Sequence, residues 1–302
     1  MIEDDWEAHR AAVFGVAYRL LGTVSDAEDV EQDVWLRAQA ADLSAVRDLR
    51  AWLVTVAAHR AYDILRSARV RRETYIGPWL PEPLLTGPDA SGPVLVDDSV
   101  STAMLVVMER LTPRERVAFV LHDVFELPFD RIAEVLGTTA EAGRQLASRA
   151  RRRAREAAEE TPRATVPERE RVLTAFRAAY QAGDIDGLVA LLHPDAVYVT
   201  DGGGRTKAAR KLIIGAARVA TTLVRVARRN ALATTDTLEV GGETALALHR
   251  DGRLIAIDTF EIDAEGRIRT LRRVINPDKL AHVPPKISWA DGVTPEHAVS
   301  SP

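Results

Sequence analysis

Arginine and glutamine side chains recur along one predicted helix in the middle of the chain, at spacings that suit reading of a DNA groove. Residues 129–136, Gly137 and a helix from about residue 139 to 155 fit a helix-turn-helix, whose second helix enters the major groove. Gly137 suits the turn, because glycine tolerates a positive φ. Arg and Gln can make bidentate contacts to guanine and adenine edges. The side chains that we expect to point outward, and to contact bases, are Glu141, Arg144, Gln145, Ser148, Arg149 and Arg152.

The arginines that follow extend the positive charge of this helix. Arg151, Arg153 and Arg155 are candidates for phosphate contacts, which supply affinity rather than sequence reading. An arginine-rich helix end also complements its own dipole and can simply stay solvated. Gly143 departs from the pattern, because glycine inside a helix costs about 1 kcal/mol relative to Ala. The helix-turn-helix spacing nevertheless makes DNA binding the favoured interpretation.

An acidic face lies on an earlier predicted helix. Residues 26–33 hold five carboxylates, a density that suits a basic protein surface. Negative charge at a helix N-terminus is favourable by itself, which explains Asp26 and Glu28 but hardly Asp33. This helix therefore predicts a contact with a basic partner.

Arginines and aromatic rings are interleaved in the next block. Residues 60–72 hold five arginines, with Tyr62 among them and Tyr75 just beyond. Such a mixture suits an unstacked single strand, because a base can lie on a ring. Trp52 and Tyr62 can equally be core residues, and for Trp52 we favour the core.

The C-terminal half contains side chains that could transfer protons, but no spacing among them specifies a reaction. Cys is absent, which excludes thiolate catalysis and Cys-ligated zinc, and His122-Asp123 forms no metal pattern. We therefore expect a protein that is not an enzyme, with no catalytic residue, no cofactor and no metal. The proton-transfer candidates are His193, Asp195, Tyr198, Asp201, His249 and Asp258.

The elements that position these residues fall into a multidomain pattern. Two all-α modules, the second a helix-turn-helix, are joined by a linker and followed by an α+β domain. The linker is rich in Pro and Gly, yet its Trp and Leu residues are too apolar to prefer water. The expected boundaries are 1–76 and 101–160 for the helical modules, 77–100 for the linker, 165–285 for the α+β domain and 286–302 for a flexible tail.

Local signals place several element ends. Residues 25–28 read as a capping box with Ser25 as N-cap, and Thr112, Pro113 and Glu115 read as a second one. In the α+β domain, two helices precede short β-like runs separated by turn signals, which predicts an antiparallel meander curved into a cone. The expected strands are 196–200, 231–240, 244–250, 254–262 and 268–275.

Composition bounds the cellular setting. The 302 residues carry a net charge of −4, an average that hides the local positive charge near residues 144–155. No stretch approaches the roughly 20 apolar residues that span a bilayer, and the acidic N-terminus is no signal peptide. We expect a cytoplasmic protein with no membrane partner.

The two helical blocks together resemble an ECF (extracytoplasmic function) sigma factor. Residues 25–37 resemble region 2.2, residues 52–66 resemble regions 2.3 and 2.4, and residues 111–155 resemble region 4. The resemblance implies binding to core RNA polymerase, at the β′ clamp helices and the β flap, and to promoter DNA. It assigns the helix-turn-helix to the −35 element. Polymerase binding falls to Asp26, Glu28, Asp29 and Asp33, and −10 binding to His59, Arg60, Asp63, Arg66 and Arg69.

Three further strings resemble ECF sigma factors that bear a SnoaL-like extension of the NTF2-like fold. Trp79-Leu80-Pro81-Glu82-Pro83-Leu84 lies in the linker, Asp201-Gly202-Gly203-Gly204-Arg205 in the α+β domain and Asn276-Pro277-Asp278-Lys279-Leu280 near its end. The resemblance implies that the extension stands in for a separate anti-sigma factor. NTF2-like cones often hold a pocket, so a small-molecule ligand is a further candidate partner.

We hypothesise that Trp79, Leu80 and Pro81 dock on the α+β domain beside the turn at 201–205 and the segment 276–280. The apolar content of an otherwise loop-like linker motivates this, because such side chains seek burial. The alternative is a helix-turn-helix regulator with a ligand-sensing cone, and a third reading is a pocket enzyme with a DNA-binding appendage. The acidic helix and the Arg/aromatic block favour the sigma factor, because a simple regulator needs neither.

Overall fold

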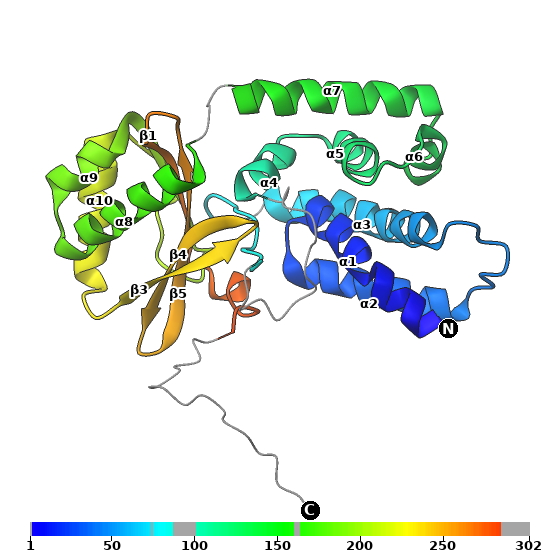
Figure 1. Cartoon of the computed structure of the whole chain (residues 1–302), viewed down its shortest axis with the longest axis horizontal. Helices are drawn as coiled ribbons and strands as arrows, with labels where there is room; N and C mark the ends of the chain where they lie inside the picture. Colours follow the sequence, from blue (N-terminus) through cyan, green and yellow to red (C-terminus); the bar gives the residue numbers. More distant parts are fainter. Residues whose placement is uncertain (1, 74, 87–100, 160–163, 285–302) are drawn as a thin grey trace, which may run out of the picture.

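The computed structural model describes residues 2–73, 75–86, 101–159 and 164–284, with backbone alone at 2–4, 68–73 and 157–159. The predicted tail at 286–302 and the linker residues 87–100 lie outside the described residues. Along the described chain, two helical modules are followed by a mixed α+β domain (Figure 1). The expected fold class is therefore confirmed.

The first helical module consists of α1 (Ile2–Leu21), α2 (Val24–Ala40) and α3 (Leu49–Glu73). Its apolar side chains recur at helical spacing and meet in one core, with Phe14, Leu21 and Leu53 almost fully buried. Trp52 packs half-buried against this core, as expected.

The predicted capping box at residues 25–28 is wrong. Helix α2 begins at Val24, one residue before Ser25, and its N-cap residue Thr23 makes no side-chain cap. Instead the Glu82 carboxylate accepts a hydrogen bond from the Val24 amide at 2.7 Å. A linker residue thus satisfies one of the amides that every helix start leaves unpaired.

The second helical module consists of α4 (Thr102–Glu109), α5 (Pro113–Phe119), the π-helical turn η1 (Val120–Val124), α6 (Phe129–Leu136) and α7 (Ala140–Glu159). The capping box of Thr112 and Glu115 is present, with Pro113 in the first turn, as predicted. Gly137 joins α6 to α7 in the left-handed conformation at φ 57°, which confirms the helix-turn-helix geometry.

The two helical modules share a single hydrophobic core. Helices α5 and α6 pack on α3, and η1 packs on α1, which places the modules side by side (Figure 1). Arg116 crosses the boundary: its buried guanidinium donates to the Leu20 carbonyl at 2.9 Å and to Glu109 at 2.6 Å. The guanidinium groups of Arg19 and Arg50, both in the first module, make cation–π contacts with the ring of Phe125 in the second module.

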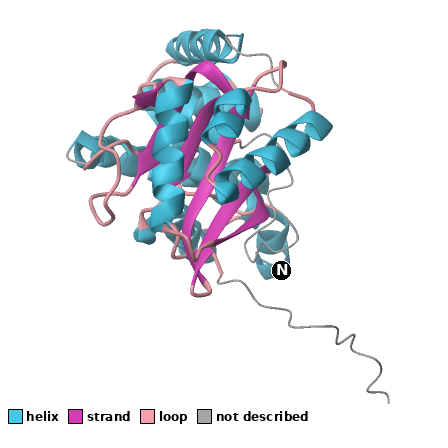
Figure 2. Cartoon of the chain, turned by 90° about the vertical axis from the view of Figure 1, so that its left-hand side faces the viewer, coloured by secondary structure: helices cyan, strands magenta, loops and turns pink. Residues whose placement is uncertain are grey.

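The third part, which we call the cone domain, spans residues 164–284. It contains α8 (Val166–Ala182), α9 (Ile185–Leu191), α10 (Ala216–Arg229) and the short η2 (Pro277–Lys279). Its strands are β1 (Leu192–Asp201), β2 (Ile213–Ile214), β3 (Thr234–Val240), β4 (Glu243–Arg250), β5 (Arg253–Ile262) and β6 (Ile268–Val274). The three longer helices cover one face of the sheet (Figure 2), where Phe176, Leu223 and Phe260 fill the core.

The sheet runs β2-β1-β6-β5-β4-β3 and differs from the prediction in two respects. Strands β3 to β6 form the expected antiparallel meander, but β1 pairs in parallel with β6. Helix α10 and the short β2, which carry the chain from β1 to β3, were not predicted. Among the described residues, no helix is both long and apolar enough to cross a membrane.

Candidate nucleic-acid interface and linker clamp

The second helix of the helix-turn-helix, α7, presents a polar face to solvent. It lies along the outer edge of the molecule, away from the first module (Figure 1). Its buried face consists of Gly143, Leu146, Ala147 and Ala150. All six predicted base-contacting side chains are exposed: Glu141, Arg144, Gln145, Ser148, Arg149 and Arg152.

Two exposed ion pairs on this face are weak, whereas a third pair, with a buried carboxylate, holds α7 against α5. Arg144 pairs with Glu141 at 2.9 Å and Arg152 with Glu156 at 3.8 Å, exposed pairs worth about 0–1 kcal/mol that a nucleic acid can displace. Arg149 instead contacts the buried Glu115 at 3.4 Å. The sequence did not reveal this contact, because Glu115 already had a role as a capping residue.

The Glu115 carboxylate ties α7 to the start of α5. Arg153 also contacts it, at 2.6 Å, so this arginine, which the sequence predicted to contact phosphate, has a structural partner within the chain. Burial opposes ionisation of Glu115, but hydrogen bonds from Thr112 and the charge of Arg153 outweigh it and lower its pKa. The carboxylate therefore stays ionised and holds both arginines.

Replacing Gly143 by Ala is expected to stabilise the chain by about 1 kcal/mol. A Cβ at this position would lie 3.5 Å from the Phe129 ring and 3.8 Å from Ile132, ordinary contact distances. The gain is the lower conformational entropy of the unfolded chain. Chemical denaturation measures it. Ala147→Gly, on the same buried face, is the reverse control and should lose a similar amount.

The predicted sites of the first module lie on α2 and α3. Glu28 and Asp29 are exposed, whereas Asp26 is half-buried and accepts a hydrogen bond from Thr23 at 2.6 Å. Glu31, part of the acidic run, is buried against Arg10 and so is not on the exposed face. The charge available to a partner is therefore smaller than the sequence suggested.

Two residues expected to serve different partners contact each other. Arg60 of α3 donates to Asp33 of α2 at 2.7 Å, in a half-exposed pair. His59, Asp63 and Arg66 are exposed on α3. The side chain of Arg69 lies outside the described residues.

A buried carboxylate joins the linker to the cone domain. Asp201, 0% exposed at the end of β1, accepts hydrogen bonds from the Tyr75 hydroxyl at 2.5 Å and the Leu80 amide at 2.8 Å. The Lys279 ammonium binds the same carboxylate at 2.8 Å and also donates to the Leu80 carbonyl. Asn276 donates to the Tyr75 hydroxyl at 3.1 Å. We call these five residues, Tyr75, Leu80, Asp201, Asn276 and Lys279, the clamp.

Aromatic rings enclose the cation of the clamp. The Lys279 ammonium lies 4.1 Å from the Trp79 ring centroid and 5.1 Å from that of Tyr75, so both rings add cation–π attraction. Burial and the neighbouring Asp201 raise the pKa of Tyr75, which keeps its hydroxyl a donor. At the rim, Arg205 and Asp278 form an exposed pair at 2.9 Å. The strings at 79–84, 201–205 and 276–280 thus meet at one place.

The opposite side of the linker contacts the first module. The Tyr18 hydroxyl donates to the Glu82 carbonyl at 2.6 Å, and the Glu82 amide donates to the Gly22 carbonyl at 2.9 Å. The Trp79 ring fills the space beside Gly22, where an added Cβ would lie 2.8 Å from it. Burial raises the pKa of Glu82, an effect that the Val24 amide partly offsets. The sequence did not assign these contacts, because the partners lie about 60 residues apart.

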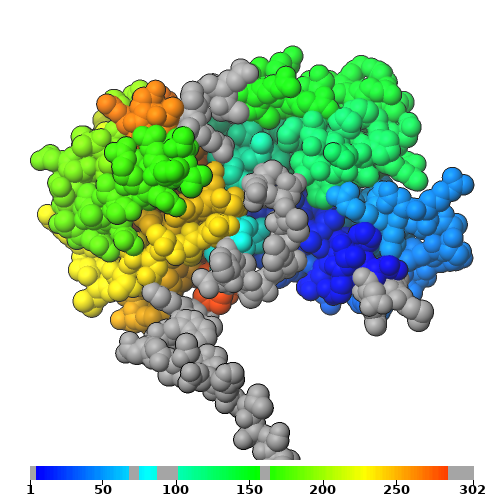
Figure 3. Space-filling view, viewed as in Figure 1, coloured from blue at the N-terminus to red at the C-terminus, as the bar shows by residue number. Residues whose placement is uncertain are grey.

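Beyond Glu82 the linker extends the sheet of the cone domain. The Thr86 amide donates to the Glu239 carbonyl and the Gly241 amide to the Leu84 carbonyl, so the linker pairs with the edge strand β3. The His282 Nε2–H donates a hydrogen bond to the Pro83 carbonyl, 2.7 Å away. In Figure 3 the cyan linker residues lie between the yellow strands and the blue helices. The linker therefore touches both neighbouring parts of the chain.

Acidification below about pH 6.5 is expected to destabilise the chain through His282. Burial lowers its pKa, although the Pro83 carbonyl opposes this. Stabilisation by such a base is complete above its unfolded pKa and is lost as the pH falls through the folded pKa. Urea unfolding of the His282→Asn variant at pH 7.5 and 5.5 should show a smaller pH-dependent loss than the unsubstituted chain. His59→Asn, on an exposed surface, should leave the loss unchanged.

The proton-transfer candidates of the cone domain do not converge. Asp258 is buried in a bidentate pair with Arg273, both bonds at 2.6 Å, and Asp201 belongs to the clamp. His249 faces Asp236 across β3 and β4, while His193 accepts from the Asp195 amide at the start of β1. Tyr198 alone of the six lines the cavity described below. No group of three potential metal ligands occurs among the described residues.

Comparisons with known proteins agree with this architecture. Residues 6–71 match the Sigma-70 region 2 family and residues 101–153 match Sigma-70, region 4. The chain is 41% identical to the ECF RNA polymerase sigma factor SigJ of Mycobacterium tuberculosis, over 93% of this chain and 94% of SigJ. It is 34% identical to the probable ECF sigma factor SigI of that species, over 91% and 93%. The crystal structure of SigJ superposes with a TM-score of 0.73, at 38% identity, over 94% of this chain and 99% of that one.

Proposed function

The chain belongs to the ECF RNA polymerase sigma factors, and we propose that its cone domain controls promoter-directed transcription in cis, through the linker. Family membership makes the chain a transcription initiation factor that binds core RNA polymerase and promoter DNA. The single observation behind the control is the clamp, in which Asp201 and Lys279 grip the backbone of Leu80.

The two DNA-binding modules have separate contacts in this proposal. The exposed face of α7 reads the −35 element, with Arg144, Gln145 and Arg152 best placed for base edges. His59, Asp63 and Arg66 of α3 contact the −10 element. The acidic residues of α2, led by Glu28 and Asp29, bind the β′ clamp helices, and the second module binds the β flap.

Promoter binding requires the helical modules to separate. By their names, the two promoter elements are centred about 25 base pairs apart, which is about 85 Å of duplex at 3.4 Å per pair. Modules that share one core cannot reach both, so the described arrangement is a closed one. The linker favours it, because Leu84 enters the core of the helical modules while Leu80 is buried against the cone domain.

The cone domain acts by contact rather than by catalysis in this proposal. Two of its acid/base candidates, Asp201 and Asp258, already form buried ion pairs with Lys279 and Arg273. A contact-based mechanism needs neither turnover nor a metal. The contact-based mechanism gives the linker the controlling role. A simple ligand-sensing regulator would give the linker contacts no function.

Truncation after residue 159 is expected to change the amount or the choice of transcripts made with core polymerase. Promoters selected from a random library by the full chain serve as templates for both proteins. Leu80→Asp, which places a charge beside Asp201, should act in the same direction as truncation. Leu232→Asp, at a position 81% exposed on the cone domain, is the matched control. Unchanged output and unchanged promoter choice in the truncated chain would contradict control in cis.

A further inference from the structure

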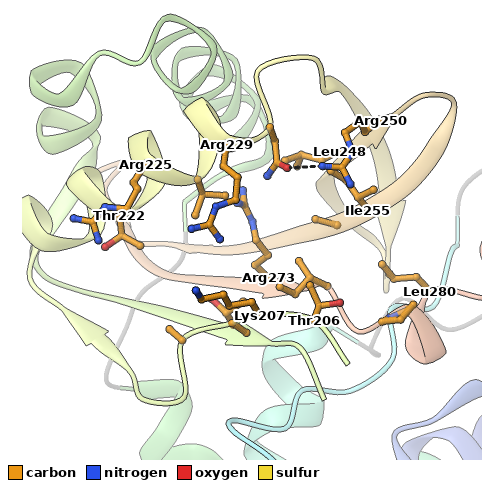
Figure 4. A pocket seen from close by; sticks show the side chains of 18 of the residues that line it. Thr206, Lys207, Thr222, Arg225, Arg229, Leu248, Arg250, Ile255, Arg273 and Leu280 are labelled. Atoms are coloured by element: carbon orange, nitrogen blue, oxygen red, sulfur yellow. Dashed lines mark hydrogen bonds between the residues drawn. The ribbon is translucent and has the colours of Figure 1, made fainter. Parts of the chain in front are cut away.

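A cavity of about 570 Å³ opens in the cone domain between α10, the sheet and the segment after β1 (Figure 4). This volume lies in the range of small-molecule sites. Its walls are mostly apolar, and the side chains that form them include Val226, Leu248, Leu254, Ile255, Ile275 and Leu280.

Positive charges surround this apolar space, and none of the described residues that line it carries a carboxylate. Arg273 closes the base, where Asp258 already neutralises it. Lys207, Arg225 and Arg229 have no ion pair with any residue in the described part of the chain. Among the described residues, the Arg250 side chain donates only to the neutral amide of Asn230, at 3.3 Å. Figure 4 shows Arg229 extending from α10 towards Arg273, with Lys207 on the opposite wall.

One polar group inside the cavity is also unsatisfied. Thr200 is 4% exposed and lines the space; the Tyr198 hydroxyl is its polar neighbour, but the Thr200 hydroxyl makes no hydrogen bond within 3.5 Å among the described residues. A buried hydroxyl without a partner is costly, and a ligand oxygen at this point would satisfy it.

We propose that this cavity binds an amphipathic organic anion. Its apolar body lies among Val226, Leu248 and Ile255, and its carboxylate or similar head group meets Lys207 and Arg229. An uncharged hydrophobic molecule would leave the cations unpaired, and a small inorganic anion would leave the apolar walls wet. An amphipathic anion matches both features at once.

The cavity lies next to the clamp, because residues adjacent in the chain to clamp residues line it, and this part of the inference rests on the proposed function. Thr206 and Leu280 line the cavity, while their neighbours Asp201 and Lys279 hold the linker. A bound anion braces both segments and should therefore slow hydrogen exchange at the Leu80 amide, which donates to Asp201.

The binding test uses the full chain and the fluorescent probe 1-anilinonaphthalene-8-sulfonate, itself an amphipathic anion. Decanoate should displace the probe, whereas decyltrimethylammonium, of equal chain length and opposite charge, should not. Acetate and phosphate should also fail. Equal displacement by the cation would overturn the proposal, and so would equal displacement by acetate or phosphate, which would indicate a surface anion site.

Variants separate the cavity from the rest of the surface. The exposed pair Arg225→Glu/Arg229→Glu should weaken decanoate binding at least about tenfold, a change of about 1.4 kcal/mol. Val226→Phe, which fills the cavity, should weaken it as well. Arg228→Glu, on the same helix but outside the lining, should bind normally; a loss equal to that of the pair would refute the site. If decanoate fails while truncation still alters transcription, this inference falls and the control in cis stands.

Discussion

Replacing Asp201 by Ala is expected to lower the free energy of unfolding by about 3–5 kcal/mol, the usual result of removing one partner of a buried ion pair. The Lys279 ammonium would be left buried without its counter-ion, and the Leu80 amide and the Tyr75 hydroxyl would lose their acceptor. Denaturant unfolding measures the loss. The linker should be released at the same time, so transcription should shift in the same direction as on truncation.

Two further variants isolate the buried charge as the cause. Asp201→Ala combined with Lys279→Met should recover part of the stability, because the unpaired cation is gone. Asp278→Ala removes an exposed partner of Arg205 directly beside the clamp residue Lys279 and should cost less than about 1 kcal/mol. Equal losses for Asp201→Ala and Asp278→Ala would refute a central role of the buried carboxylate.

Replacing Arg116 by Met is expected to separate the two helical modules. The guanidinium is 3% exposed and links α5 to the Leu20 carbonyl at the end of α1. Hydrogen bonds from a charged group are worth about 1.5–3 kcal/mol, and Glu109 would also lose its partner. The closed arrangement should therefore lose about 2–4 kcal/mol relative to an open one.

Energy transfer between two dyes can follow this opening, since the chain contains no cysteine to interfere. Leu36→Cys on α2 and Arg131→Cys on α6 place the labels on exposed positions of the two modules. Transfer efficiency should fall in the Arg116→Met background. Arg114→Met, whose guanidinium contacts Leu136 within the second module, should leave it unchanged. Equal efficiency in both backgrounds would show that Arg116 does not hold the modules together.

The sequence predicted those features that local chemistry determines. Thr112, Pro113 and Glu115 lie within four residues, so their capping box was readable, and Gly137 marked the turn before α7. The start of α2 was not readable, because its cap is Glu82, 58 residues further along the chain. The local signal at Ser25 therefore predicted the wrong residue.

Non-local pairing explains the errors in the cone domain. Strand β1 pairs in parallel with β6 about 70 residues later, and no short pattern reports such a partner. Helix α10 buries Val219, Ala220, Leu223 and Val224 at helical spacing, but its β-branched residues lower the intrinsic helix propensity and weaken the signal. The three strings that contribute to the clamp were recognised, whereas the contact of Tyr75 with Asp201 was not predicted, because the two residues lie 126 positions apart.

Because Glu82 of the linker caps α2, the order of the first turn of α2 depends on whether the linker is docked. When the linker leaves, the Val24 amide loses its acceptor and the turn that precedes Glu28 and Asp29 frays. A helix that carries acidic residues for a partner would then present them on a looser backbone. Under the proposed control in cis, docking of the linker therefore sets the rigidity of the turn that precedes this acidic surface.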